Sequence, residues 1–383
     1  MESDRRFVDG ERYAWNPYLA VDLSEDWKLG LSYEYANDDR VPDRGLPSIA
    51  TSAGQPNTPV RGYDRLFFGV PGVNRTTLEA HIAKLRLDGQ LADNLKFTST
   101  LLYGDYDKLY VNVYANSAVS ASNTVTLDAY SDPTKRENLI GQANLIWDVE
   151  TGTLDHKLLF GVEYGDQKTR NMRFNRTFSP GTTFNLNNPV YPTVTFTTPS
   201  RNTVSDVEFV SAYVQDQIGI GEHFDIVIGL RYDHFQIDGI DFIPAVDRPF
   251  GRSDDKISPR FGLIWKPQEN ISIYSSFSRS FLPRSGDQFI SLTTTQENLA
   301  PEKFTNYELG AKWDIRPDLN VTAALFQLDR ANATTPDPAN PLTSINVGET
   351  RTKGLELAVT GRVLPDWQVS AGYTWQDGTL RGN

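Results

Sequence analysis

The stretch FDIVIGLRY at residues 224–232 alternates between apolar and polar side chains. Successive side chains of a β-strand point to opposite faces, so this segment predicts a strand with one apolar face and one polar face. The same pattern recurs in residues 307–315 and 367–375. It is also present around residues 13–21, 27–35, 139–149, 158–164 and 355–359. The chain is therefore predicted to be an all-β protein.

A soluble antiparallel sheet shows the same alternation, so a two-layer β-sandwich or a solenoid stays open on this pattern alone. Two features favour a transmembrane barrel. Aromatic residues stand at the ends of the apolar stripes, as Trp27 and Tyr35 do, and such rings form the girdles of outer-membrane barrels. The opposite faces are rich in Gly, Ser, Thr, Asn and Gln, as a water-filled interior requires.

The connections between strands are alternately short and long. Short turns are predicted at residues 24–26, 92–94, 150–155, 221–223, 267–270, 316–318 and 364–366. Long polar loops are predicted near residues 37–74, 110–135, 171–206, 238–255, 282–303 and 331–347. Each short turn joins two strands, so the pattern predicts a transmembrane antiparallel β-barrel segment of about 14 strands. A strand of about 10 residues tilted by roughly 45° covers about 23 Å, close to the apolar band of such barrels.

Two segments fit this pattern poorly. In residues 77–87 the apolar phase changes between Ile82 and Ala83, which predicts a β-bulge or a misplaced boundary. Asp216 falls on the otherwise apolar face of residues 207–220. Because a charge is costly at the centre of a bilayer, we expect Asp216 near the membrane interface at the short-turn end.

Composition excludes several classes of protein. The 383 residues hold 37 Lys and Arg against 49 Asp and Glu, with no basic cluster, so nucleic acid is not an expected partner. No apolar run approaches 18 residues, which excludes membrane-spanning helices. The chain has no cysteine, and its four histidines are scattered without zinc-ligand spacing. We therefore expect no enzyme active site and no metal site.

Several motifs resemble the barrel signature of TonB-dependent outer-membrane receptors. They are SRSFLP at 278–283, ENLAPEK at 297–303, NYELGAK at 306–312 and TKGLEL at 352–357. The loop DRVPDRGLPS at 39–48, with Phe67-Phe68-Gly69, resembles the ferric-siderophore branch of that family. The resemblance implies a bacterial outer-membrane location and energy-coupled uptake of ferric siderophores. It also implies contact with outer-membrane lipid and lipopolysaccharide.

Members of this family carry an N-terminal signal, a segment that contacts TonB and a globular plug, and they close as 22-stranded barrels. Met1–Arg6 has no apolar signal region, no plug is visible, and the chain stops at Asn383 instead of an aromatic residue. The resemblance therefore implies that residues 1–383 are part of the barrel domain, incomplete at both ends. The TonB complex would act through the missing N-terminal segment.

A ferric siderophore brings its iron fully chelated, so the resemblance implies neither a metal ligand nor a cofactor in the protein. An anionic chelate favours Arg, and a flat chelating group favours aromatic faces. The candidate ligand-binding residues are Arg40, Arg44, Phe67, Phe68, Tyr106, Tyr110, Arg279 and Arg284.

Three other functions stay open. A haem receptor normally needs an outer-loop histidine, and none lies between Phe281 and Pro301. A passive porin would need neither plug nor TonB. An outer-membrane protease or lipase would need a rim histidine, and only His234 is placed for that role.

Overall fold

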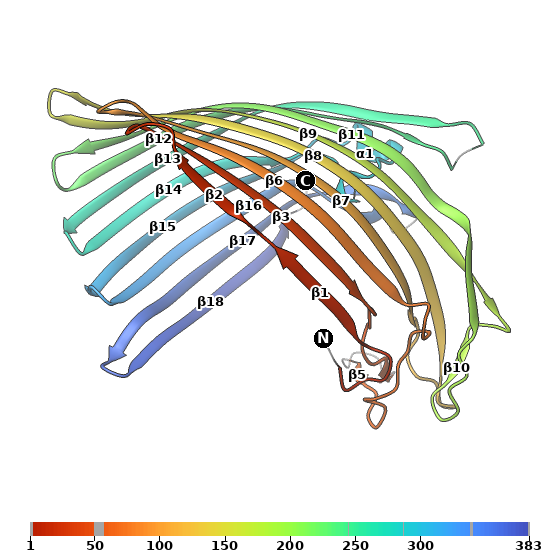
Figure 1. Cartoon of the computed structure of the whole chain (residues 1–383). Coiled ribbons are helices and arrows are strands. Elements are labelled where there is room, and N and C mark those ends of the chain that lie inside the picture. Colours follow the sequence, from red (N-terminus) through yellow and green to blue (C-terminus); the bar gives the residue numbers. More distant parts are fainter. Residues whose placement is uncertain (1–2, 50–56, 244, 286, 338–339, 382–383) are drawn as a thin grey trace.

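The computed structural model describes residues 3–49, 57–243, 245–285, 287–337 and 340–381. A single strongly curved antiparallel sheet dominates it (Figure 1). The main strands are β1 (Gly10–Trp15), β2 (Tyr18–Asp22), β3 (Trp27–Arg40), β6 (Arg75–Ala92), β7 (Leu95–Ala115), β8 (Thr124–Thr151), β9 (Leu154–Ser179), β11 (Thr193–Ile220), β12 (Phe224–Asp241), β13 (Arg248–Gln268), β14 (Ile271–Leu282), β15 (Glu302–Arg316), β16 (Leu319–Asp337), β17 (Asn340–Leu364) and β18 (Trp367–Arg381). Shorter pieces are β4 (Ser48–Ile49), β5 (Thr58–Pro59), β10 (Thr183–Asn185), the 3₁₀ helix η1 (Asp287–Phe289) and α1 (Thr294–Asn298).

Each main strand pairs with the next one along the chain. In the described part of the chain, the hydrogen-bonded path β1-β3-β6-β7-β8-β9-β11-β12-β13-β14-β15-β16-β17-β18 contains fourteen strands. β2 prolongs β1 along the same partner, since both pair with β3. The predicted strand number and antiparallel topology are confirmed. β1 and β18 form no ladder with each other among the described residues, so the sheet is open along one side.

The seven predicted short turns are confirmed, and their hairpins gather at the left of Figure 1. We call this edge the turn end and the opposite edge the loop end. Gly152 and Gly221 lie in two of the turns with φ of 67° and 59°. This left-handed conformation costs glycine little because it has no Cβ.

The predicted loops are too long in four places. β8, β9 and β11 have 28, 26 and 28 residues, so the ladder runs far beyond the apolar band into residues 124–135, 171–179 and 193–206. β12 with β13, and β16 with β17, likewise extend through most of residues 238–255 and 331–347. Beyond the apolar band these extensions meet loops and water instead of lipid, so their side chains need not continue the lipid-facing pattern; Val125, Leu127 and Ala129, for example, are buried there.

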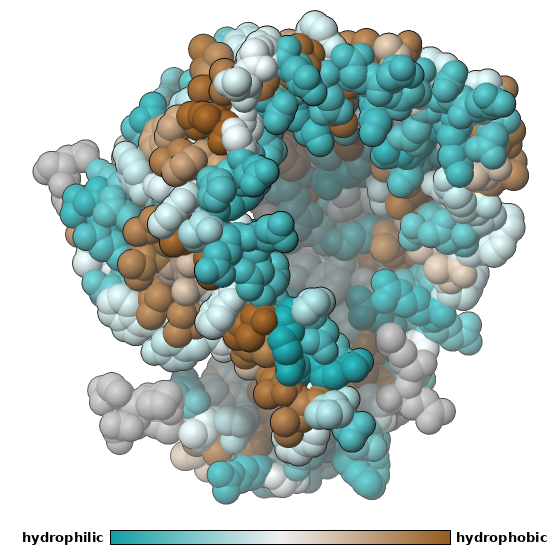
Figure 2. Space-filling model, turned by 90° about the vertical axis from the view of Figure 1, so that its left-hand side faces the viewer, coloured by the Kyte–Doolittle hydropathy of each residue, from teal (hydrophilic) through white to brown (hydrophobic). Residues whose placement is uncertain are grey.

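The apolar stripes lie on the convex outer face. Ile228 and Leu230 are 50% and 49% exposed, and Leu309 is 53% exposed, so no second protein layer covers them. The opposite side chains line a hollow interior that is mostly hydrophilic (Figure 2). A β-sandwich buries its apolar faces, so the structure excludes that alternative.

The bulge expected in residues 77–87 is wrong. β3 and β6 pair without a break from Trp27↔Gly89 to Arg40↔Thr76. Ile82 pairs with Glu34 on the inner face, whereas Ala83 pairs with Tyr33 on the outer face. The change of phase is therefore an apolar residue facing the interior.

Asp216 lies four residues before the end of β11, at the turn end, as predicted. It is on the outer face, where Oδ2 lies 2.8 Å from Nδ1 of His156. Thr151 Oγ1 lies 2.7 Å from the other ring nitrogen of His156. The carboxylate of Asp216 is thus hydrogen-bonded to His156 at the level where the apolar band ends.

The described helices are short. α1 has five residues, and none of the helices in the described ranges is long and apolar enough to cross a membrane.

Replacing Ile228 by Lys should test the assignment of the two faces. On the lipid-facing side the charge should cost about 2–4 kcal/mol of folding free energy, whereas Val227→Lys points into the wet interior and should cost much less. Denaturant unfolding of the complete protein in phospholipid vesicles measures both values. Equal losses for the two variants would contradict the assignment.

Candidate functional site

A compact apolar core holds the loop end together. It joins residues 60–70, the outer parts of β7 and β8, and residues 184–186. Its buried members are Val60, Phe68, Val70, Val113, Val125, Leu127, Ala129, Phe184 and Leu186. Burial of these side chains gives the segment between β3 and β6 a fixed position over the loop end.

Asn74 attaches this segment to the sheet. The side chain is 3% exposed, and its amide nitrogen donates to the carbonyl oxygen of Val113 (2.9 Å). Its oxygen accepts from the backbone N–H groups of Val70 (2.9 Å) and Val113 (3.2 Å). A buried amide with its hydrogen bonds satisfied fixes the local geometry, so Asn74 holds residues 70–74 against β7.

Phe67 and Phe68 belong to the framework of this region. They are 1% and 2% exposed, and Phe68 packs edge-on against Phe184 at 6.0 Å. The predicted ligand-facing rings therefore contact protein in this structure. Their sequence position suggested an exposed loop, but apolar contacts with residues more than 100 positions away bury them.

Arg44 lies against tyrosine rings on the inner face. Its guanidinium carbon is 3.7 Å from the ring centre of Tyr114, and Nη2 donates to the hydroxyl of Tyr130 at 2.8 Å. The ring of Tyr110 lies 5.7 Å from that of Tyr130, and Arg173 lies 4.7 Å from the same ring. We call Arg44, Tyr110, Tyr114, Tyr130 and Arg173 the Arg–Tyr cluster.

The two arginines of the cluster differ in whether a carboxylate neutralises their charge. Arg173 forms an ion pair with Asp132 at 2.6 Å. Among the described residues, no carboxylate lies within ion-pair distance of Arg44, which is exposed. Burial raises the pKa of Tyr130 above its ordinary value, so its hydroxyl stays neutral at physiological pH. The cluster thus presents one uncompensated positive charge among neutral aromatic rings.

The structure brings together two of the predicted residues, Arg44 and Tyr110, and adds Tyr114, Tyr130 and Arg173, which were not predicted from the sequence. Tyr106, Tyr110 and Tyr114 recur every four residues, so continued alternation along β7 could have placed Tyr114 on the same face. Tyr130 and Arg173 left no such signal, because their approach depends on the pairing of β7, β8 and β9.

Tyr106 and Arg40 also face inward but lie outside the cluster. The hydroxyl of Tyr106 lies over Gly104, where a Cβ would approach it within 2.7 Å. Arg40 pairs with Asp38 at 3.4 Å, which balances its charge.

Arg279 points away from the interior. It pairs with Thr305 in the ladder and shares the outer face with Phe277, which pairs with Tyr307. The prediction that the side chain of Arg279 faces a ligand at the mouth of the barrel is therefore wrong, because the side chain lies on the outer face. Strict alternation from Ile271 and Ile273 already assigns position 279 to the outer face.

Arg284 anchors the segment between β14 and β15. It is 8% exposed, pairs with Glu302 at 2.7 Å and donates to the carbonyl oxygen of Ala300 at 3.0 Å. Arg330 contacts the other oxygen of Glu302 at 2.5 Å. Buried and neutralised, Arg284 holds the segment in place and presents no free charge at the mouth.

That segment folds back against the inner wall. Its Phe289 carbonyl accepts from Ser205 of β11 at 2.6 Å, and Leu292 is buried with Val207, Ile237 and Phe250. The segment therefore narrows the loop end, and its Gln288 carbonyl oxygen also accepts a hydrogen bond from Arg136 of β8.

The structure offers no grouped metal ligands in its described ranges. No set of three or more His, Cys, Asp or Glu side chains is placed there to hold a metal ion. The Arg–Tyr cluster combines the positive charge of Arg44 with three tyrosine rings, and this combination suits an anionic aromatic molecule.

A family model described as "TonB dependent receptor-like, beta-barrel" matches residues 14–383. The chain belongs to this family. Its members are receptors in the outer membrane of Gram-negative bacteria, so the chain is an outer-membrane β-barrel protein and not an enzyme. Membership also decides against the passive porin and the barrel protease or lipase.

Relatives of this chain include siderophore receptors. It is 29% identical to the probable TonB-dependent siderophore receptor PiuA of Acinetobacter baumannii over 96% of this chain and 53% of PiuA. The crystal structure of PiuA superposes with a TM-score of 0.86 at 27% identity, covering 98% of this chain and 57% of that one. The ferric-catecholate import receptor Fiu of Escherichia coli, in its closed form, gives a TM-score of 0.83 at 22% identity, covering 99% and 59%. The chain thus spans about half the length of these relatives.

Acid should release the segment between β14 and β15. Burial alone raises the pKa of Glu302, but Arg330 and Arg284 hold it below its ordinary value. The stabilisation is therefore fully present above the ordinary pKa of about 4.3 and is lost as pH falls through the lowered value. Amide protection factors for residues 283–301 should stay constant from pH 7 to about pH 5 and fall below about pH 4.

Glu302→Gln should lower the same protection factors about tenfold or more at pH 7 and abolish their dependence on acid. Glu308→Gln, on the same strand but outside this network, is the matched control and should retain both. A parallel acid response in wild type and Glu302→Gln would contradict the role of Glu302.

Proposed function

We propose that the complete receptor to which this chain belongs imports ferric siderophores across the outer membrane, driven by the TonB complex. The observation that carries this proposal is the Arg–Tyr cluster, in which Arg44 lies 3.7 Å from the centre of the Tyr114 ring with no carboxylate partner in the described chain. Siderophore receptors among its relatives support the same conclusion.

The chemistry of the cluster suits a ferric chelate. Iron arrives with its coordination sphere filled, so recognition rests on the negative charge and aromatic groups of the chelator. Arg44 supplies charge-assisted hydrogen bonds, and Tyr110, Tyr114 and Tyr130 supply flat surfaces for stacking. A ferric catecholate, which combines flat rings with net negative charge, is the class that this arrangement fits best.

We therefore propose that a ligand first contacts Arg44 and Tyr110, together with Tyr114 and Tyr130. Arg40 and Tyr106 are proposed as a second inward-facing set, because Arg40 is in register with Tyr110 through Thr76 and Tyr106 lies on the same face four residues nearer the turn end.

We further propose that additional strands and a plug complete the receptor. Among the described residues, β1 and β18 each form a ladder on one side only, and lipid offers no hydrogen-bond partners to the backbone groups along an open sheet edge. Pairing with further strands would satisfy them and close the barrel. The plug would carry the contact with TonB.

Replacing Arg44 by Gln should weaken binding of a ferric chelate about 10- to 100-fold, since a charge-assisted contact is worth about 1.5–3 kcal/mol. The measurement is quenching of tryptophan fluorescence in the complete receptor, titrated with the ferric complex of 2,3-dihydroxybenzoate. Arg86→Gln is the matched control, because Arg86 lies on the inner face nearer the turn end and Asp88 balances its charge at 2.6 Å, and it should change the affinity less than threefold. Equal losses of affinity in both variants would show that any positive charge on the inner face supports binding, and would contradict a specific role of Arg44.

Transport itself is tested in a deletion strain supplied with iron only as this complex. The strain should grow with the wild-type receptor and an intact TonB system, grow slowly with Arg44→Gln, and fail without TonB. Growth independent of TonB would overturn energy-coupled uptake.

A further inference from the structure

The inner wall below the Arg–Tyr cluster carries cations without carboxylate partners. On β6, β7 and β8 they are Lys84, Lys108 and Arg136, which we call the cation track. The ladder pairs Lys84↔Leu102 and Tyr106↔Arg136, with alternation along β7, place all three on the inner face. No ion pair joins any of the three to a carboxylate among the described residues.

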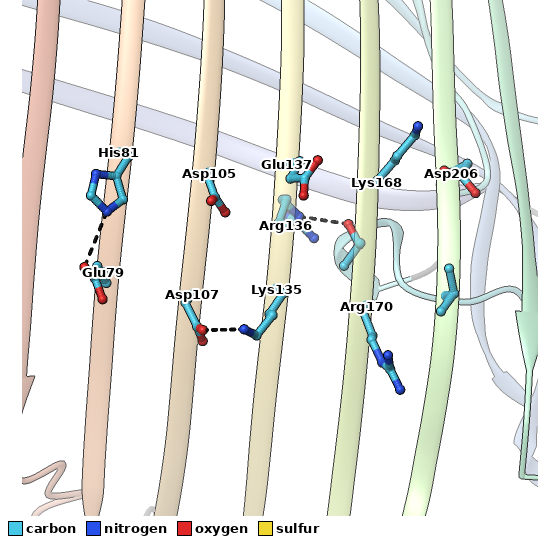
Figure 3. A pocket seen from close by; sticks show the side chains of 12 residues that line it. Glu79, His81, Asp105, Asp107, Lys135, Arg136, Glu137, Lys168, Arg170 and Asp206 are labelled. Atoms are coloured by element: carbon cyan, nitrogen blue, oxygen red, sulfur yellow. Dashed lines mark hydrogen bonds and ion pairs between the residues drawn. The ribbon is translucent and has the colours of Figure 1, made fainter.

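Arg136 keeps its charge uncompensated although it is half-buried. Its Nε donates to the hydroxyl of Thr169 at 3.1 Å and its Nη2 to the carbonyl oxygen of Gln288 at 2.6 Å, and both acceptors are neutral. Figure 3 shows Arg136 on β8 between Lys135 and Glu137, with a dashed line for the bond to Thr169. The two hydrogen bonds hold the guanidinium against the wall, so its position is fixed while its positive charge remains available to an anion.

Carboxylates are scarce on this wall. In the described chain, the inward positions of β6, of β7 and of residues 134–146 hold a single carboxylate, Asp88. Arg86 neutralises it at 2.6 Å. In contrast, Glu308 and Glu356 lie on the inner faces of β15 and β17, so the two sides of the lumen differ in charge. A passage lined by charges of one sign raises the local concentration of ions of the opposite sign.

The cation track descends in short steps from the cluster towards the turn end. Counted along β7 from Tyr110, the ladder places Lys108 two residues lower, Arg136 four residues lower and Lys84 eight residues lower. The steps are therefore about 7, 7 and 13 Å along the strands. They are comparable to the roughly 8 Å over which a charge acts in physiological salt, so an anion at one cation is still attracted by the next.

We propose that the cation track leads an anionic ferric chelate from the Arg–Tyr cluster into the barrel along the wall of β6, β7 and β8. The route rests on the proposed function, since the ferric chelate is its cargo. The chelate exchanges one charge-assisted contact for the next, so no single position holds it tightly. The inner face of β13 also carries two cations, Lys256 and Arg260, but the Arg–Tyr cluster is not built on that strand. They provide the matched comparison.

The test uses the complete receptor in a strain from which its gene is deleted, supplied with the ferric complex of 2,3-dihydroxybenzoate. Uptake of radioactive iron is measured at a saturating concentration of the complex, so that a change in affinity does not alter the rate. Lys84→Glu with Lys108→Glu should lower the uptake rate at least tenfold. Lys256→Glu with Arg260→Glu makes the same change of charge on the inner face of β13 and should lower the rate less than twofold.

Lys84→Arg with Lys108→Arg keeps both charges and should retain the wild-type rate. Thermal unfolding separates transport from stability, and the double glutamate variant of the track should unfold within about 2 °C of the wild type. A slow rate accompanied by a large loss of thermal stability would overturn the proposal, because the lysines would then act by holding the receptor together. Equal rates in the two double glutamate variants would overturn it as well. Absence of uptake by the wild-type receptor would instead contradict the proposed function.

Discussion

Every peptide group that faces lipid must find its hydrogen bond within the protein, and the rest of this structure depends on that constraint. An unbroken antiparallel ladder satisfies it. The ladder in turn imposes a period of two on the side chains, so each strand presents one row to lipid and one to water. A single charged residue on the lipid-facing row, such as Asp216, is accommodated where the apolar band ends and His156 provides a hydrogen bond.

The ladder does not stop where the membrane stops. β8, β9 and β11 continue as tall extensions, and the same alternation acts there in different surroundings. On their inner face, Tyr130 and Arg173 meet Tyr110 and Tyr114 of β7. One loop, attached through Asn74, adds Arg44 to them. A rigid wall and a single fixed loop thus build the candidate binding surface.

Neighbouring residues of one strand therefore lie on opposite faces of the sheet and meet different surroundings. On β8, Lys135 lies on the outer face, whereas Arg136 points inward and donates to Thr169. On β9, Lys168 and Arg170 are exposed on the outer face, whereas Thr169 and Asn171 are buried on the inner face. Because successive side chains alternate between the two faces, the charged residues of the outer face and those of the inner face form separate sets.

The sequence by itself determined the strands, their number, their short turns and which face meets lipid, because all of these follow from the local period of two. It also located Asp216, and its list of ligand-binding candidates included Arg44 and Tyr110, which the structure brings close together. The sequence analysis was wrong about a bulge near Ile82, about the direction of Arg279 and about the length of the loops. At Ile82 an apolar side chain faces the interior, and in the other two cases the alternation was not followed to the end of the strand. Only the tertiary structure decided that Phe67, Phe68 and Arg284 are buried, and that Tyr130 and Arg173 complete the cluster. Those outcomes depend on contacts between residues far apart in the sequence, such as Phe68 with Phe184 and Arg44 with Tyr130, which no local pattern encodes.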